Sequence, residues 1–133
     1  MERVRERLAV AGQALKTFEE ILREPKTSIV RDAAIQRFEY TFEAVWKAAR
    51  SYLMVMESLN AGSPKSAMRS SHQVGLLTEE QARCALAMAD DRNLTVHTYN
   101  EALAEKIYSN LFQYAPLMES WLSAMERQLQ EKR

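Results

Sequence analysis

Residues 30–59 read VRDAAIQRFEYTFEAVWKAARSYLMVMESL, and Phe38, Phe42, Trp46 and Tyr52 make them the heaviest apolar segment of the chain. Apolar residues recur there at intervals of three and four and keep a seven-residue register, the pattern of a helix with one buried face. The members of this stripe are Ile35, Phe38, Phe42, Val45, Ala49, Tyr52, Met56 and Leu59. We therefore predict one long helix, which Asn60-Ala61-Gly62 brings to an end.

The segment before it, residues 2–24, has a second stripe of the same period. Its members are Val4, Leu8, Ala11, Leu15, Phe18 and Leu22. Pro25 ends this helix, because a proline disfavours the helical conformation of the residue before it. Two long amphipathic helices joined by a short connection are expected to pack antiparallel.

Three further helices follow. Ser63-Pro64 places a capping serine and a proline at the start of a short helix, which ends near Val74-Gly75. Thr78 and Gln81 form a capping box that opens the next helix. Asn100 can cap the last one. The apolar stripe of this last helix comprises Leu103, Ile107, Leu111, Tyr114, Met118, Trp121, Met125 and Leu129. Pro116 lies within that helix and predicts a kink there.

The composition agrees with a helical fold. The chain has 133 residues, 47% of them apolar, and only three glycines and three prolines, which is typical of a compact helical protein. This length suits one domain and is short for two. We predict an all-α, up-and-down four-helix bundle with an additional short helix, formed as a single domain by residues 1–133.

Charge and special residues exclude several classes of protein. Basic and acidic residues number 18 each, so no global positive field is available to hold a long nucleic acid. Cys84 is the only cysteine, which leaves no intrachain disulfide. Neither histidine, His72 or His97, has an acid three residues before it, as a di-iron bundle would need. We expect no metal and no cofactor.

Nothing in the sequence indicates export or a membrane. The first residues carry both signs of charge and no apolar segment of a secretion signal follows them. No run approaches the roughly 18 apolar residues of a membrane-spanning helix. We expect a soluble, cytoplasmic protein without membrane contact.

The stretch from Asp90 to Asn100, DDRNLTVHTYN, combines an arginine, a histidine and a tyrosine where one helical pattern stops and another begins. Arg92 continues the inward stripe of Ala85 and Met88, and a buried arginine is costly unless an anion meets it. In a continuous helix His97 would lie about 140° around the axis from Arg92. The β-branched residues around it weaken the helix, so His97 could turn back toward Arg92.

An arginine beside a histidine suits phosphodiester chemistry. The imidazole can move a proton to or from a ribose 2′-hydroxyl, and the guanidinium can hold a phosphate and stabilise developing charge. The residues alone leave other interpretations open. Arg92 can pair with Asp90, Asp91 or an acid of a neighbouring helix, His97 can cap helical carbonyls, and Tyr99 can be a core aromatic.

Arg92-Asn93-(x3)-His97-x-Tyr99 resembles the R-x4-H-x-Y signature of the HEPN superfamily. The preceding Asp90-Asp91 and the Ser63-Pro64-Lys65 helix start agree more narrowly with its nucleotidyltransferase substrate-binding (HepT-like) branch. The likeness covers nearly the whole chain, including length and helix order.

The resemblance implies a four-helix-bundle homodimer that binds a separate minimal nucleotidyltransferase, with RNA or a nucleotide as a further ligand. It implies metal-independent ribonuclease activity of a toxin, carried by Arg92 and His97, with Asn93 and Asp91 binding substrate. It also implies silencing by transfer of AMP to Tyr99.

Two other classes of function remain open: a non-catalytic subunit that binds a nucleotide or substrate for its partner, and a plain helical dimerisation module. Dimerisation is also suggested by aromatic side chains outside the core stripes, namely Trp46, Tyr108 and Phe112, which we expect to form an exposed patch.

Overall fold

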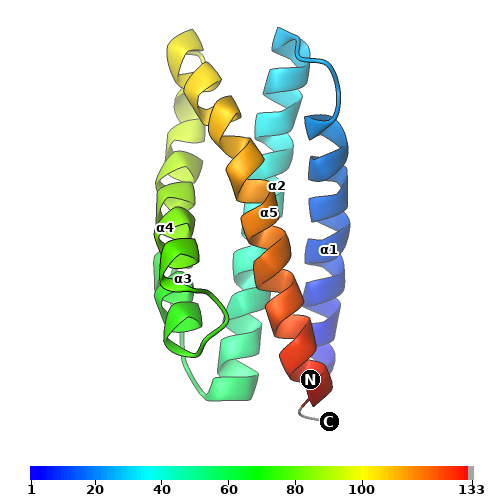
Figure 1. Ribbon diagram of the computed structural model, residues 1–133, viewed down its shortest axis with the longest axis vertical. Helices are drawn as coiled ribbons and strands as arrows, with labels where there is room; N and C mark the ends of the chain where they lie inside the picture. Colours follow the sequence, from blue (N-terminus) through cyan, green and yellow to red (C-terminus); the bar gives the residue numbers. More distant parts are fainter. Residues whose placement is uncertain (132–133) are drawn as a thin grey trace.

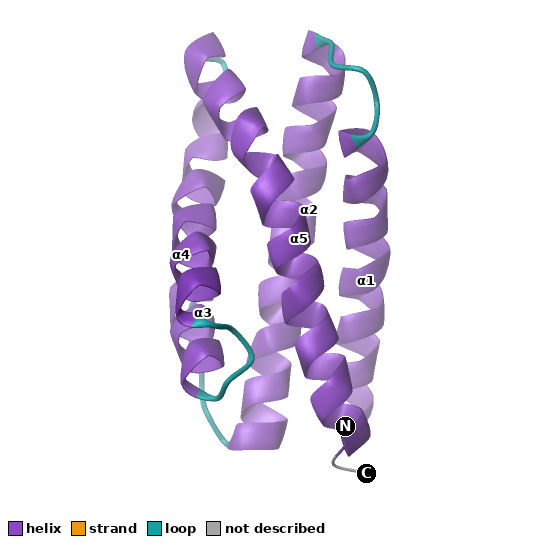
Figure 2. Cartoon of the chain, in the orientation of Figure 1, coloured by secondary structure: helices purple, strands orange, loops and turns teal. Residues whose placement is uncertain are grey.

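The computed structural model describes residues 1–131 and consists, over that range, of helices and their connections (Figures 1 and 2). The helices are α1 (Glu2–Leu22), α2 (Ser28–Glu57), α3 (Pro64–Gln73), α4 (Glu79–Leu94), the 3₁₀ turn η1 (Thr95–His97) and α5 (Glu101–Glu131). The predicted all-α bundle with one additional short helix is therefore confirmed. The long helix expected at 30–59 begins and ends two residues earlier than predicted.

The four long helices run side by side (Figure 1). The α1–α2 connection and the turn between α4 and α5 lie at the same end of the bundle, whereas the end of α5 lies beside the start of α1 at the other. Buried Arg31, near the start of α2, bonds Glu101 and Glu105 of α5 at 2.7 and 3.0 Å. This contact fixes the start of α5, directly after the η1 turn, against α2.

Side-chain caps set most of the helix starts. Thr27 and Ser63 accept hydrogen bonds from the backbone N–H groups of Val30 and Ser66. Thr78 and Gln81 make the predicted reciprocal capping box. Asn100 Oδ1 accepts from the N–H of Leu103 at 3.1 Å. These caps satisfy N–H groups that a helix start leaves without partners.

The core is an aromatic cluster between α1, α2 and α5. Phe38 lies at its centre, with ring centroids 6.0 Å from Phe18, 6.0 Å from Phe42 and 5.7 Å from Tyr114. Further along α5, buried Trp121 donates to Ser71 of α3 at 3.0 Å. The stripes predicted for α1, α2 and α5 supply these buried side chains.

One expectation about the surface is wrong. Trp46 and Tyr108 are only 7% and 6% exposed, and only Phe112, at 47%, is open to solvent. Trp46 also donates to Glu43 at 3.1 Å, while Tyr108 packs edge-on against Phe112. Both rings are buried although neither belongs to a predicted core stripe. The aromatic patch therefore does not exist as predicted, and it no longer supports a dimer.

Pro116 lies inside α5, which continues to Glu131, and the kink expected there stays a prediction.

Within residues 1–131, no helix combines the length and the apolar character that crossing a membrane requires.

Candidate functional site

The predicted loosening after the fourth helix is present. Helix α4 ends at Leu94, and Thr95–His97 form a 3₁₀ turn. The hydroxyl of Thr98 donates to the carbonyl of Thr95 at 3.0 Å, and the N–H of Asn100 bonds the carbonyl of His97 at 3.0 Å. Local hydrogen bonds of this kind compete with a continuing helix. They turn the chain before α5 begins and place His97 and Tyr99 on the surface.

Arg92 is half-buried and faces α2. Its side chain is 25% exposed, and Nη1 lies 3.4 Å from Glu39 Oε2. Nε lies 3.8 Å from Glu43 Oε1, is itself buried and makes no hydrogen bond among the residues described. The guanidinium is therefore compensated by two carboxylates of a neighbouring helix, one of the alternatives left open for it.

Thr95 completes this cluster. Its buried hydroxyl accepts from Arg92 Nη1 at 3.1 Å. The same oxygen lies 3.0 Å from Glu39 Oε2 and 2.7 Å from the Arg92 carbonyl oxygen, either of which its proton can reach. The hydroxyl thus ties the first residue of the η1 turn to both members of the ion pair.

His97 and Tyr99 form a second, exposed cluster. His97 Nδ1 lies 3.2 Å from the Tyr99 hydroxyl, and the two rings meet edge to face with centroids 5.8 Å apart. Tyr99 is 81% exposed, so it is not a core aromatic, which was one of the interpretations left open for it. An imidazole nitrogen at this distance can accept the phenol proton, which makes the oxygen a better nucleophile.

The two clusters lie at opposite ends of the η1 turn. Arg92 reaches Thr95 at the start of the turn, and His97 ends it. In residues 1–131 no hydrogen bond or ion pair joins Arg92 to His97. An anionic ligand could lie between a guanidinium on one side and an imidazole–phenol pair on the other.

The neighbouring residues have different surroundings. Asp91 faces α5, where it accepts from Tyr114 at 2.6 Å and from Asn110 at 3.0 Å. Burial, followed by the bond to Asp91, raises the pKa of Tyr114. Asp91 therefore anchors α4 on α5, and its part in substrate binding stays a prediction. Asn93, on the other side of Arg92, is exposed.

Sequence reasoning allowed an acidic partner for Arg92 on a neighbouring helix but did not identify which acids these are. Glu39 and Glu43 lie one helical turn apart on α2 and flank Phe42 of the core stripe. Acids at the edge of a buried stripe are a weak signal by themselves, because most such residues face water. A helical pattern also does not say which helix will lie opposite.

No cluster of three or more histidine, cysteine or carboxylate side chains within residues 1–131 is placed to bind a metal ion. At the α4–α5 turn, the side chains predicted to carry the chemistry are those of Arg92, His97 and Tyr99, and their roles stay predictions.

The chain is thus a small, all-helical bundle that carries an arginine and an exposed histidine–tyrosine pair at one turn between two helices. Comparison identifies the family. The sequence profile described as "nucleotidyltransferase substrate binding protein like" matches residues 6–127, so the chain belongs to this family. The predicted HEPN-type, nucleotidyltransferase substrate-binding branch is thereby confirmed.

Solved structures agree. A protein from Thermus thermophilus is 53% identical and superposes with a TM-score of 0.84, over 86% of this chain and 98% of its own. A Haemophilus influenzae protein, described as having the fold of a substrate binding domain of a nucleotidyltransferase, is 21% identical, with a TM-score of 0.76 over 90% of this chain and 98% of its own.

The toxin–antitoxin MntA–HpeT contains a chain that is 14% identical, with a TM-score of 0.73 over 96% of this chain and 99% of its own. At this identity the likeness concerns the fold. No curated protein sequence matches the chain significantly.

Proposed function

We propose that this protein is the substrate-binding subunit of a two-protein nucleotidyltransferase module, and that it is a ribonuclease toxin that its partner silences. The observation that carries the proposal is the exposed His97–Tyr99 pair, one short turn from a half-buried Arg92. The family match and the similarity to a toxin–antitoxin chain support the same interpretation.

Cleavage would follow from proton transfer by His97. The neutral imidazole takes the proton of a ribose 2′-hydroxyl, the 2′-oxygen attacks the adjacent phosphorus, and the bond to the 5′-oxygen breaks. The products are a 2′,3′-cyclic phosphate and a 5′-hydroxyl, whose proton must come from an acid. Arg92 would stabilise the extra negative charge on the phosphoryl oxygens. Water supplies no atom to this step, and no metal is required.

The departing 5′-oxygen needs an acid while His97 acts as the base. In a homodimer with the two turns facing one cleft, His97 of the second copy can give that proton. Val96 and Tyr99 leave large apolar surfaces exposed on this turn, at 67% and 81%, which a second copy would cover. We therefore propose that the homodimer forms through this turn and not through the aromatic patch predicted from the sequence.

Silencing would use the same histidine. The Tyr99 oxygen attacks the α-phosphorus of ATP, pyrophosphate leaves, and the phenol proton passes to His97 Nδ1, 3.2 Å away. The attached phosphodiester would then occupy the space beside His97 and attract the guanidinium of Arg92. Both catalytic groups would be blocked by one covalent change.

The test is RNA cleavage in the presence of a chelator, with intact-mass measurement. Wild type should cut RNA. Arg92→Ala and His97→Ala should cut it at least about 100-fold more slowly than wild type while keeping the fold. Incubation with the neighbouring nucleotidyltransferase and ATP should add the mass of AMP to wild type and stop cleavage. Tyr99→Phe, which keeps the ring and lacks the nucleophile, should gain no mass and should still cut. Equal cleavage by wild type and both catalytic variants would end the ribonuclease proposal.

A second candidate is a non-catalytic binding subunit, favoured by the ion pairs that already compensate Arg92. RNA would then stay intact. Binding to the nucleotidyltransferase would persist in His97→Ala and fall in a variant that alters the exposed surface of the turn, such as Val96→Asp.

A further inference from the structure

A small hollow lies where the end of α4 approaches the start of α3. It has a volume of about 220 Å³. Its lining comprises Phe42, Ser63, Pro64, Lys65, Ala89 and Asn93. The start of α3 comes close to the end of α4 here, because Lys65 Nζ pairs with Asp90 at 2.6 Å. The hollow therefore stands between three helices, and one of its walls is the residue after Arg92.

The lining divides into an apolar floor and a polar rim. Phe42 and Ala89 are buried and form the floor with the ring of Pro64. The rim carries the exposed amide of Asn93, which makes no hydrogen bond within residues 1–131, and the ammonium group of Lys65. A flat apolar group with hydrogen-bonding edges and a nearby negative charge would match this arrangement.

We propose that this hollow binds a single nucleobase, with Asn93 reading its edge and Lys65 holding an adjacent phosphate. Ligand pockets for drug-sized molecules begin at about 300 Å³, so a hollow of 220 Å³ suits one base and not a whole dinucleotide. An asparagine amide offers one donor and one acceptor side by side, which matches the edge of a base. Unstacked bases of single-stranded RNA are commonly recognised in this way.

The position of the hollow connects it to the proposed ribonuclease site, and this inference rests on that proposal. Phe42, its floor, lies on the same turn of α2 as Glu39 and Glu43, the two acids that pair with Arg92. Asn93 directly follows Arg92 on α4, about 100° around the helix axis, so the hollow and the guanidinium lie on adjoining faces of one helical turn. A base seated in the hollow would leave its backbone phosphate near the guanidinium.

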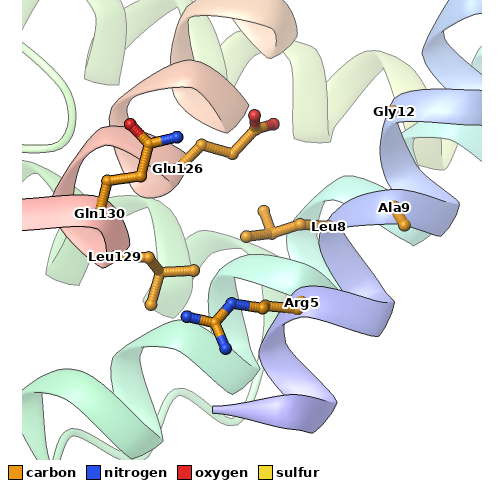
Figure 3. A pocket seen from close by; sticks show the side chains of 7 residues that line it. All are labelled: Arg5, Leu8, Ala9, Gly12, Glu126, Leu129 and Gln130. Carbon is orange, nitrogen blue, oxygen red and sulfur yellow. The ribbon is translucent and has the colours of Figure 1, made fainter. Parts of the chain in front are cut away.

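A second hollow, at another place in the bundle, lacks this combination. This hollow, of about 410 Å³ between α1 and α5, is lined by Arg5, Leu8 and Glu126 among others (Figure 3). Figure 3 shows open space between side chains of the two helices, without an aromatic floor. It lies at the far end of the bundle from the η1 turn, and it supplies the matched control.

The test measures binding of a six-nucleotide RNA with 2′-O-methyl riboses, which the proposed mechanism cannot cut. An abasic site is placed at each position in turn. One position should weaken binding about tenfold when its base is absent, since a stacked base commonly contributes that much. Ala89→Leu, which fills the hollow, should remove this position dependence and leave binding of the abasic strand unchanged. Ala9→Leu, the same exchange in the hollow of Figure 3, should retain it.

A second variant guards against misfolding of Ala89→Leu. Asn93→Asp changes an exposed side chain with little change of shape, removes the donor and adds negative charge. It should weaken binding of the preferred base and change which base is preferred. A parallel titration with AMP, followed through the NMR signals of the Asn93 amide, distinguishes the source of the base.

The outcomes separate the two proposals. A sensitive RNA position that both variants affect supports the hollow with RNA as the source. AMP binding that Ala89→Leu abolishes, without any sensitive RNA position, supports the hollow with a mononucleotide as the source. If neither ligand responds to filling the hollow, the base site is wrong, even where the RNA is still cut. If wild type binds AMP in the hollow but does not cut RNA, the ribonuclease proposal is wrong and the base site stands.

Discussion

Helices α5 and α4 are held in the bundle in different ways. Helix α5 buries thirteen side chains, including Tyr114 and Trp121, whereas α4 buries only four, and three of those are alanines. Polar contacts position the last turn of α4 instead: Asp91 bonds α5, and Arg92 pairs with acids of α2. Packing of large side chains gives stability, and directional polar contacts give orientation to the helix that carries the candidate site.

Removing a core ring should cause the largest change. Phe38→Ala should lower the free energy of unfolding by about 3 to 5 kcal/mol, because the ring contacts aromatic side chains of three helices. Urea unfolding followed by circular dichroism measures this. Phe112→Ala, on the half-exposed ring of α5, is the control and should cost less than about 1 kcal/mol. Equal losses would contradict the assigned core.

Breaking the polar anchor of α4 should cost less and depend on pH. Tyr114→Phe should lower stability by about 1.5 to 3 kcal/mol, the usual value of a hydrogen bond to a charged group. The pKa of Tyr114 is raised in the folded protein, so its proton is held more tightly there. This contribution is complete below the unfolded pKa of about 10 and falls as pH rises above it.

A stability profile from pH 7 to 11 checks the sign. Wild type should lose stability above pH 10 more steeply than Tyr114→Phe does. Asn110→Ala removes the other donor to Asp91 without a titrating group and should keep the wild-type slope. A wild-type profile that is flat or rises in this range would show that Asp91 does not hold a protonated Tyr114.

Releasing Arg92 should change ligand binding more than stability. Glu39→Gln removes one of the two charges that compensate the guanidinium and keeps its side-chain shape. RNA affinity should rise about two- to fivefold and become more dependent on salt, because a free guanidinium contributes a phosphate contact. The melting temperature should change little, since partly exposed ion pairs contribute about 0 to 1 kcal/mol. Glu57→Gln, a charge change of equal size at the end of α2, controls for net charge; an equal gain there would contradict the assignment.

The exposed link between α3 and α4 should matter least for stability. Asp90→Asn removes the partner of Lys65, and the Lys65 and Asp90 side chains are 39% and 62% exposed. The expected loss is below about 0.5 kcal/mol, measured by thermal unfolding. A larger loss would mean that α4 depends on this contact as it does on Asp91.

Much of the bundle could be predicted from the sequence, because helix patterns and caps are local. The stripes of α1, α2 and α5, the Ser63-Pro64 start and the Thr78–Gln81 box were all readable from a few neighbouring residues. The burial of Trp46 and Tyr108 was not, since it depends on the neighbouring helices that cover each ring. A stripe shows one buried face and misses residues at its edges.

For the candidate site, the residue types and the turn came from the sequence. The R-x4-H-x-Y spacing selected Arg92, His97 and Tyr99, and the β-branched residues of this stretch predicted the end of α4. The sequence could not assign the partners of Arg92, because Glu39 and Glu43 are far away along the chain. It also could not show that Asp91 points to α5 while Asn93 faces a hollow.

The sequence by itself determined the number of helices, their limits to within about two residues and the residues proposed to carry the chemistry, because caps, periodicity and motifs act over a few residues. Only the tertiary structure decided which charges meet, since ion pairs and hollows form between segments that the chain brings together after folding. Arg92 shows both: its presence is a matter of sequence, and its two acidic partners are a matter of packing.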